Sequence, residues 1–110
     1  MYIPDRGDIV WLNFSPQSGH EQSGLRPALV VSPKVYNQKV GLGLFCPITS
    51  SIKGYTFEVK LPSDLNVNGV VLSDQIRSLD WRQRKAKFEC KAGSTVIDEV
   101  TGKIAALIYS

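Results

Sequence analysis

Short apolar segments closed off by glycine, proline or serine recur through most of the chain, and this pattern constrains the fold more than any other feature. The segments are rich in β-branched, aromatic and aliphatic residues, as strands are. They cover residues 8–14 (DIVWLNF), 27–32 (PALVVS), 42–48 (LGLFCPI), 55–61 (YTFEVKL), 69–79 (GVVLSDQIRSL) and 84–91 (RKAKFECK). Between five and seven short strands in one small antiparallel sheet are therefore expected.

Alternation of apolar and polar side chains predicts which face of two strands is buried. The apolar positions are Tyr55, Phe57, Val59 and Leu61 in segment 55–61, and Ala86, Phe88 and Cys90 in segment 84–91. Each set is expected to face the core. Pro47 cannot donate a hydrogen bond within a sheet, so it should mark a strand end or a sheet edge.

The C-terminal segment has the pattern of a helix. Apolar residues recur at helical spacing at Ile97, Val100, Ile104, Leu107 and Ile108. Thr95 and Asp98 have the spacing of a capping box, and a short helical turn is also expected in residues 33–39 (PKVYNQK). The strands and the C-terminal helix together predict a mainly β fold, a small antiparallel barrel or half-barrel capped by that helix.

The length of 110 residues predicts a single domain over residues 1–110. Cys46 and Cys90 lie far apart with only His20 to join them, so neither a disulfide nor a metal site is expected. No apolar run approaches the roughly 18 residues of a membrane span, and the N-terminus lacks the layout of a secretory signal. A cytoplasmic protein without membrane contact is expected.

Positive charge is concentrated in one part of the chain. The net charge is +3, whereas residues 77–91 alone hold six basic residues against Asp80 and Glu89, a balance of +4. Such a concentration is typical of a face that binds a polyanion. A solvated edge strand that carries lysines explains it equally well.

Arg26 and Thr49 are the strongest candidates for chemistry. Arg26 begins one strand and Thr49 follows the next, so antiparallel pairing places both at the same end of the sheet, beneath a loop that carries His20, Glu21 and Gln22. A guanidinium, a hydroxyl and a carboxylate suit a phosphodiester, because arginine donates two parallel hydrogen bonds to phosphate oxygens. Taken singly, Arg26 could form an ion pair at a strand edge, and the Thr49, Ser50 and Ser51 hydroxyls could stabilise a turn.

The usual enzyme signatures are missing from the sequence: the phosphate-loop glycine pattern, the GxSxG and HExxH motifs and an Asp-rich metal cluster. Any catalysis is therefore expected to need neither a metal nor an organic cofactor.

Several ordered motifs resemble the MazF/PemK toxins of bacterial type II toxin–antitoxin systems, nearly from end to end. They are PDRGDIVWLNFSP, GHEQSGLRPALVVSP, YN, CPITSSIKGYTFEV and GVVLSDQIRSLDWRQRKA. The resemblance implies a small SH3-like β-barrel with a C-terminal helix, assembled as a homodimer. It also implies a sequence-specific, metal-independent endoribonuclease that cuts single-stranded RNA, chiefly messenger RNA, and is neutralised by a cognate acidic MazE-like antitoxin.

The resemblance also implies roles for particular residues. The family's catalytic arginine and threonine fall on Arg26 and Thr49, and neither position departs from the pattern. Glu21 matches the loop acid, and Gln75 matches a residue near the RNA groove. The expected reaction is attack by the RNA's own 2′-hydroxyl, which leaves a 2′,3′-cyclic phosphate and a 5′-hydroxyl. Glu21 and His20 both remain candidates for the general base.

Further residues are predicted to contact RNA. Phe14 and Trp81 could stack on bases, although core packing for Phe14 and a dimer or antitoxin contact for Trp81 remain alternatives. Phosphate contacts are predicted for Lys53, Arg77 and Arg84. Other candidate RNA contacts are His20, Gln22, Ser50, Asp74 and Gln75.

Two other classes of protein remain possible from the sequence. A topoisomerase poison of the CcdB type would share the fold, but such toxins use a C-terminal tail with a tryptophan, whereas this chain ends in ALIYS. An SH3-like module that binds nucleic acid without cutting it would also explain the basic segment. Both predict that RNA incubated with the protein stays intact.

Overall fold

The computed structural model describes residues 1–15, 19–20 and 24–110. Its strands are β1 (Asp8–Asn13), β2 (Leu25–Val30), β3 (Gly43–Thr49), β4 (Glu58–Lys60), β5 (Val70–Leu72), β6 (Arg77–Leu79) and β7 (Lys87–Lys91). Its helices are α1 (Lys34–Val40), α2 (Ser94–Tyr109) and the single 3-10 turn η1 (Ser73–Gln75). The prediction of a mainly β fold with a C-terminal helix is confirmed.

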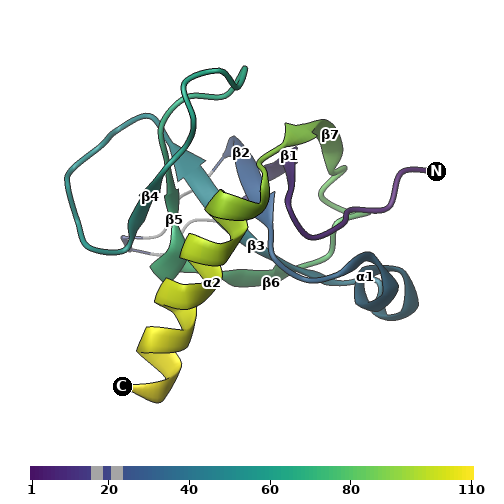
Figure 1. Cartoon of the computed structure of the whole chain (residues 1–110). Helices are drawn as coiled ribbons and strands as arrows, with labels where there is room; N and C mark the ends of the chain where they lie inside the picture. Colours follow the sequence, from purple (N-terminus) through teal and green to yellow (C-terminus); the bar gives the residue numbers. More distant parts are fainter. Residues whose placement is uncertain (16–18, 21–23) are drawn as a thin grey trace.

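The strands form one antiparallel sheet in the order β4-β5-β3-β2-β1-β7, with β6 paired to β3 beside this path (Figure 1). Within the described residues no pairing joins β4 to β7, so the sheet is not closed into a barrel. The central strand β3 changes neighbour along one side, from β6 at Gly43–Phe45 to β5 at Ile48–Thr49.

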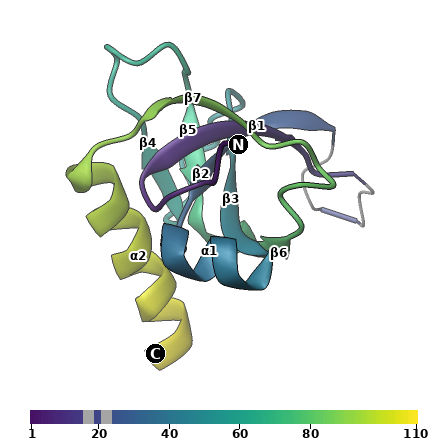
Figure 2. The ribbon, with the colours of Figure 1, turned by 90° about the vertical axis from the view of Figure 1, so that its right-hand side faces the viewer.

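Two apolar clusters pack on the two faces of this sheet. The larger contains Ile9, Leu29, Ile48 and Val71 from the strands, and Val100 from α2 packs against them. Figure 2 shows α2 standing to one side of the sheet, with α1 at the end near β6. The second cluster comprises Val10, Leu12, Phe14, Ala28, Val30, Phe45, Leu79 and Trp81. In the described part of the chain, neither helix is long and apolar enough to cross a membrane.

A buried carboxylate at the start of β1 joins the N-terminal segment to β7. Asp8 is 2% exposed, and its Oδ2 accepts hydrogen bonds from the Tyr2 hydroxyl (2.6 Å) and the Asp5 amide (3.1 Å). Its Oδ1 pairs with the ammonium of Lys91 on β7 at 2.9 Å. The carboxylate thus receives the donors that a buried charge requires.

Two expectations about strands are wrong. Only 58–60 of segment 55–61 is a strand, and Tyr55 is exposed because its carbonyl accepts the Glu58 amide in a turn that precedes β4. Phe88 is also exposed. It lies on β7, which is a strand at the edge of the sheet.

Two details of the termini and of β3 also differ from expectation. Helix α2 begins after Gly93, and its first turn has no side-chain cap, so Thr95 and Asp98 do not form a capping box. Pro47 lies inside the central strand instead of at its end. It is tolerated because it stands where β3 passes from β6 to β5, so its missing amide donor falls between the two pairings on that side.

Candidate active site

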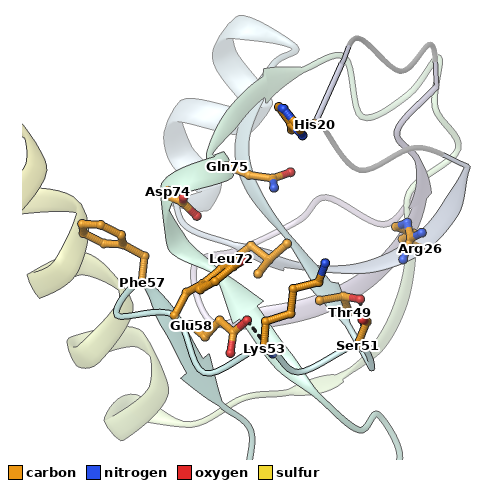
Figure 3. Close-up of a pocket in the computed structure, with 11 residues that line it drawn as sticks. His20, Arg26, Thr49, Ser51, Lys53, Phe57, Glu58, Leu72, Asp74 and Gln75 are labelled. Carbon is orange, nitrogen blue, oxygen red and sulfur yellow. Dashed lines mark hydrogen bonds between the residues drawn. The ribbon is translucent and has the colours of Figure 1, made fainter.

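A cavity of about 540 Å³ opens at the end of the sheet where β2 begins and β3 ends (Figure 3). Six of the residues predicted to act on RNA line it: His20, Arg26, Thr49, Lys53, Asp74 and Gln75. The other lining residues, which were not predicted to act on RNA, are Ser51, Tyr55, Phe57, Glu58 and Leu72. The structure therefore gathers residues from β2, β3, β4, β5, η1, the segment before β4 and His20 of the β1–β2 connection around one hollow.

Arg26 and Thr49 meet because of the register between β2 and β3. Ala28 pairs with Pro47, and the same antiparallel register continued by two residues sets Arg26 opposite Thr49. Side chains two residues apart point to the same face of a strand, so both face the side on which Ala28 and Phe45 pack. Figure 3 shows the guanidinium of Arg26 and the hydroxyl of Thr49 on the same side of the cavity. This confirms that the two strand ends converge.

The Thr49 side chain is 7% exposed and held by the backbone around it. Its Oγ1 accepts a hydrogen bond from the Ser51 amide at 3.1 Å. Because the oxygen is the acceptor in this bond, the hydroxyl hydrogen can still donate toward the cavity. On the other side, Thr49 pairs with Val70 of β5.

Gly69 makes this pairing possible. Its φ is +119°, and a Cβ added to it would lie 2.1 Å from the carbonyl oxygen of Thr49. Only glycine lets the backbone of this turn approach Thr49 so closely. The position of a candidate catalytic hydroxyl thus depends on a residue outside the cavity.

Segment 51–57 forms one wall of the cavity and is held by hydrogen bonds at three points. The Glu58 carboxylate accepts the amides of Lys53 (3.1 Å) and Gly54 (2.9 Å). The carbonyl of Phe57 accepts from both the amide and the hydroxyl of Ser73, and the Lys103 ammonium of α2 donates to the carbonyl of Thr56. The wall is therefore held by β4, η1 and α2 together.

Arg77 and Arg84 hold the end of β1. An Nη1 of Arg77 donates to the carbonyl of Phe14 at 2.9 Å, and Nη1 of Arg84 donates to the carbonyls of Asn13 and Ser15, each at 2.8 Å. Neither arginine is among the described lining residues of the cavity. The sequence predicted that these two arginines contact phosphate. In the structure their guanidiniums instead bind backbone carbonyls at the start of the connection between β1 and β2.

The two predicted stacking residues do not present a ring to RNA. Phe14 is 0% exposed and belongs to the second apolar cluster, so the core-packing alternative is correct. Trp81 is 2% exposed, packs in the same cluster and donates its indole N–H to the carbonyl of Asn37 at 3.1 Å. A base cannot stack on either side chain without opening the core.

Three other predicted residues are Ser50, Glu21 and Gln22. Ser50 is exposed and follows Thr49, but it is not among the lining residues. Glu21 and Gln22 fall outside the described residues, whereas their neighbour His20 is exposed and lines the cavity.

Charges of both signs face the cavity. Arg26 and Lys53 supply the cations, and Glu58 and Asp74 supply the carboxylates. Both cysteines are free thiols, and burial, followed by the negative charge of Asp74, raises the pKa of the Cys46 thiol to about 12. That thiol is therefore neutral near pH 7 and is no nucleophile. Across residues 1–15, 19–20 and 24–110, no three His, Cys, Asp or Glu side chains are grouped so as to hold a metal ion.

Comparison with known proteins points to one family. A family profile described as "PemK-like, MazF-like toxin of type II toxin-antitoxin system" matches residues 5–108. The chain is 44% identical over 107 residues to the endoribonuclease toxin MazF of Escherichia coli strain K12, covering 97% of this chain and 96% of that protein.

Two solved structures from Deinococcus radiodurans agree with this match. The crystal structure of MazF superposes with a TM-score of 0.96 at 55% identity and covers 100% of both chains. A MazE–MazF crystal structure superposes with a TM-score of 0.90 at 56% identity and covers 99% of this chain and 98% of that one.

Proposed function

Because the chain belongs to the PemK-like, MazF-like toxins of type II toxin–antitoxin systems, we propose that its cavity is where RNA is cut and that Arg26 and Thr49 bind the scissile phosphate. As a member of this family the protein is an endoribonuclease toxin. The observation that carries the site assignment is the register of β2 and β3, which directs a guanidinium and a hydroxyl to the same side of the cavity.

Arg26 and Thr49 can supply what cleavage by the RNA's own 2′-hydroxyl requires. The 2′-oxygen attacks phosphorus as it loses its proton, the bond to the 5′-oxygen breaks, and that oxygen gains a proton. The products are a 2′,3′-cyclic phosphate and a 5′-hydroxyl. In the transition state, negative charge grows on the non-bridging oxygens of the phosphate. A fixed guanidinium and a hydroxyl donor stabilise that charge.

The proposed proton acceptor belongs to the connection between β1 and β2. Glu21 and His20 are the two candidates, and of these His20 is described and lines the cavity. Arginine is a poor base because its guanidinium stays protonated, so Arg26 is assigned to charge stabilisation.

Partners follow from the family. Because a Deinococcus radiodurans relative has been solved as a MazE–MazF complex, a cognate acidic antitoxin of the MazE type is proposed for this chain. The proposed substrate is single-stranded messenger RNA, the proposed assembly is a homodimer, and the proposed compartment is the cytoplasm, where that substrate is found.

Arg26→Ala tests the assignment. The purified protein is incubated with a long single-stranded transcript in EDTA, and both new ends of each fragment are mapped. The wild type should cut at a repeated short sequence and leave cyclic-phosphate and 5′-hydroxyl ends. Loss of one preorganised donor to a transition-state oxygen costs about 100- to 1,000-fold in rate, so Arg26→Ala should cut at least about 100-fold more slowly.

Arg82→Ala is the matched control. Arg82 is exposed, its guanidinium carbon lies 5.0 Å from the ring centre of Trp81, and it does not line the cavity. Its loss removes the same charge and should leave the rate of cutting unchanged. Undiminished cutting by a folded Arg26→Ala protein would disprove the assignment, and an intact transcript with the wild type would favour a topoisomerase poison or a binding module.

A further inference from the structure

The carboxylate of Glu58 is unexpected on the wall of a cavity that receives a phosphodiester, because it repels phosphate. Glu58 is the first residue of β4, pairs with Leu72 of β5 and is partly exposed. Its side chain nevertheless folds back to the wall that precedes it. An acid in such a place needs an explanation in terms of what it touches.

Both carboxylate oxygens of Glu58 accept backbone amides of consecutive residues. Oε2 accepts from Lys53 at 3.1 Å and Oε1 accepts from Gly54 at 2.9 Å. Figure 3 marks the bond to Lys53 with a dashed line. Hydrogen bonds to an ionised acceptor are about twice as strong as those between neutral groups. The carboxylate therefore fixes the two peptide groups around the Cα of Lys53.

The turn at 53–54 is built for this contact. Gly54 has φ +79°, a left-handed conformation that favours glycine and that turns the chain directly after the two amides bound by Glu58. The Glu58 amide in turn donates to the carbonyl of Tyr55 at 3.1 Å, which closes the segment onto β4. Since residues 50–56 are all exposed, core packing does not hold this turn, and hydrogen bonds must do so.

Lys53 is the residue whose placement depends on the turn. Its side chain extends from the turn toward the side of the cavity that holds Thr49 and Arg26 (Figure 3). A lysine side chain has a long flexible stem, so a fixed Cα greatly narrows the volume that its ammonium samples.

We propose that Glu58 is a positioning residue for RNA cleavage, whose carboxylate holds the 53–54 turn so that Lys53 presents its ammonium to the phosphate bound by Arg26. The inference rests on the proposed function, since it takes the cavity to be the place where RNA is cut. It assigns to Glu58 no proton transfer and no contact with RNA.

The proposal and simple electrostatics predict effects of opposite sign for Glu58→Gln. Removing a negative charge from the cavity should strengthen RNA binding if charge repulsion alone mattered. If Glu58 positions Lys53, the substitution should weaken binding, because glutamine keeps one acceptor oxygen and loses the other. The sign of the change in KM therefore separates the two.

The first experiment measures kcat and KM on a short RNA that spans a cut site mapped with the wild type. For loss of one contact with a charged group we expect KM to rise about tenfold in Glu58→Gln, with kcat changed less. Lys53→Ala should show a similar rise. Glu99→Gln, which removes the same charge from an exposed position on α2, is the control and should match the wild type.

The double variant Lys53→Ala/Glu58→Gln decides whether Glu58 acts through Lys53. If it does, the KM of the double variant should be no more than about twofold higher than that of Lys53→Ala alone. Once Lys53 is removed, Glu58 has no further effect to lose. Multiplied effects, a lower KM in Glu58→Gln, or loss of the acid limb of its pH–rate profile would each overturn the proposal. The last result would make Glu58 the general base.

A second measurement needs no RNA and remains valid if the site assignment fails. Amide hydrogen exchange followed by NMR should show protection of the Lys53 and Gly54 amides in the wild type and at least about tenfold faster exchange there in Glu58→Gln, with β2 and β3 unchanged. Unaltered exchange at both amides would contradict the contact itself. Full cutting by Arg26→Ala would instead refute the proposed function and leave this contact standing.

Discussion

The hydroxyl of Thr49 is fixed by backbone groups instead of by other side chains. The Ser51 amide donates to it, β5 pairs beside it, and the turn at Gly69 passes so close that a methyl group there would overlap the Thr49 carbonyl. The backbone at Gly69 and at Thr49 is packed so closely that no atom can be added between them. Gly69, which does not line the cavity, should therefore be highly sensitive to substitution.

Gly69→Ala should lower both stability and cleavage. An added Cβ meets backbone at 2.1 Å and the φ of +119° disfavours any side chain, so β5 must move away from Thr49. We expect a loss of about 3 kcal/mol or more in the free energy of unfolding, measured by urea titration, with slower RNA cutting in the folded fraction.

Gly41→Ala serves as the control for Gly69→Ala. Gly41 has φ +81°, but a Cβ there would meet nothing within 4 Å. It should cost only the strain of the left-handed conformation, about 1–2 kcal/mol, and leave cutting intact. Equal losses in both variants would show that the close approach to Thr49 is unimportant.

At the scale of elements, helix α2 covers one face of the sheet with only part of its length. Val96 and Val100 are buried, whereas Leu107 and Ile108 near its end are 45% and 68% exposed. Its helical spacing was readable from the sequence, but its start was not. A glycine at position 93, with φ +94° and no side-chain bond, replaces the predicted cap.

Gly102→Ala should stabilise the protein. Gly102 lies in the interior of α2 and is exposed, and a methyl group added there would meet nothing within 4 Å. Alanine in an exposed helix interior is favoured over glycine by about 0.5–1 kcal/mol. The reciprocal change at the exposed Ala106, Ala106→Gly, should cost a similar amount in urea unfolding. A less stable Gly102→Ala protein would mean that another surface packs against this face.

The strand ends that form the site could be predicted, and the walls around them could not. Antiparallel pairing of two apolar segments was enough to bring Arg26 and Thr49 together. Glu58 was missed because its role depends on a turn that bends back onto it, and the alternation of segment 55–61 suggested an uninterrupted strand. Phe14 was misassigned because sequence alone does not distinguish a buried ring at a strand end from an exposed one.

At the scale of the whole molecule, several protons are held more tightly in the folded chain than in the unfolded one. Burial and the hydrogen bond to Asp8 raise the pKa of Tyr2, burial raises the pKa of Cys46 to about 12 from 9.0, and the bond to Asp8 raises the pKa of Lys91. A raised folded-state pKa gives stability that is complete below the unfolded value and is lost as the pH rises.

Stability should therefore fall in alkaline solution. The unfolded chain releases these protons first, beginning near the ordinary thiol pKa of 9.0, so the free energy of unfolding should decline from about pH 9 upward. Urea titrations between about pH 7 and pH 11 measure the decline. Lys91 contributes little, because its side chain is 73% exposed and solvent screens its pair with Asp8.

Tyr2→Phe isolates the part that Tyr2 plays in the pH dependence of stability. It removes the donor to the buried Asp8, so it should be less stable near pH 7 and should lose less stability toward pH 11. A wild-type urea midpoint that stays level up to about pH 11 would contradict the argument.

Hydrogen bonds join the two ends of the connection between β1 and β2. The Phe14 amide donates to the carbonyl of Gly24 at 2.9 Å, the Gly24 amide donates to the hydroxyl of Ser15 at 3.0 Å, and Arg77 and Arg84 secure the carbonyls of residues 13–15. Closing a loop costs little more when its length grows, once its ends are joined. Residues between these ends can thus be replaced without rebuilding the sheet that holds Arg26 and Thr49, and under the proposed function such replacements would alter the contacts to RNA and not the chemistry. Diversification of targets and retention of chemistry are separable traits in such a scaffold.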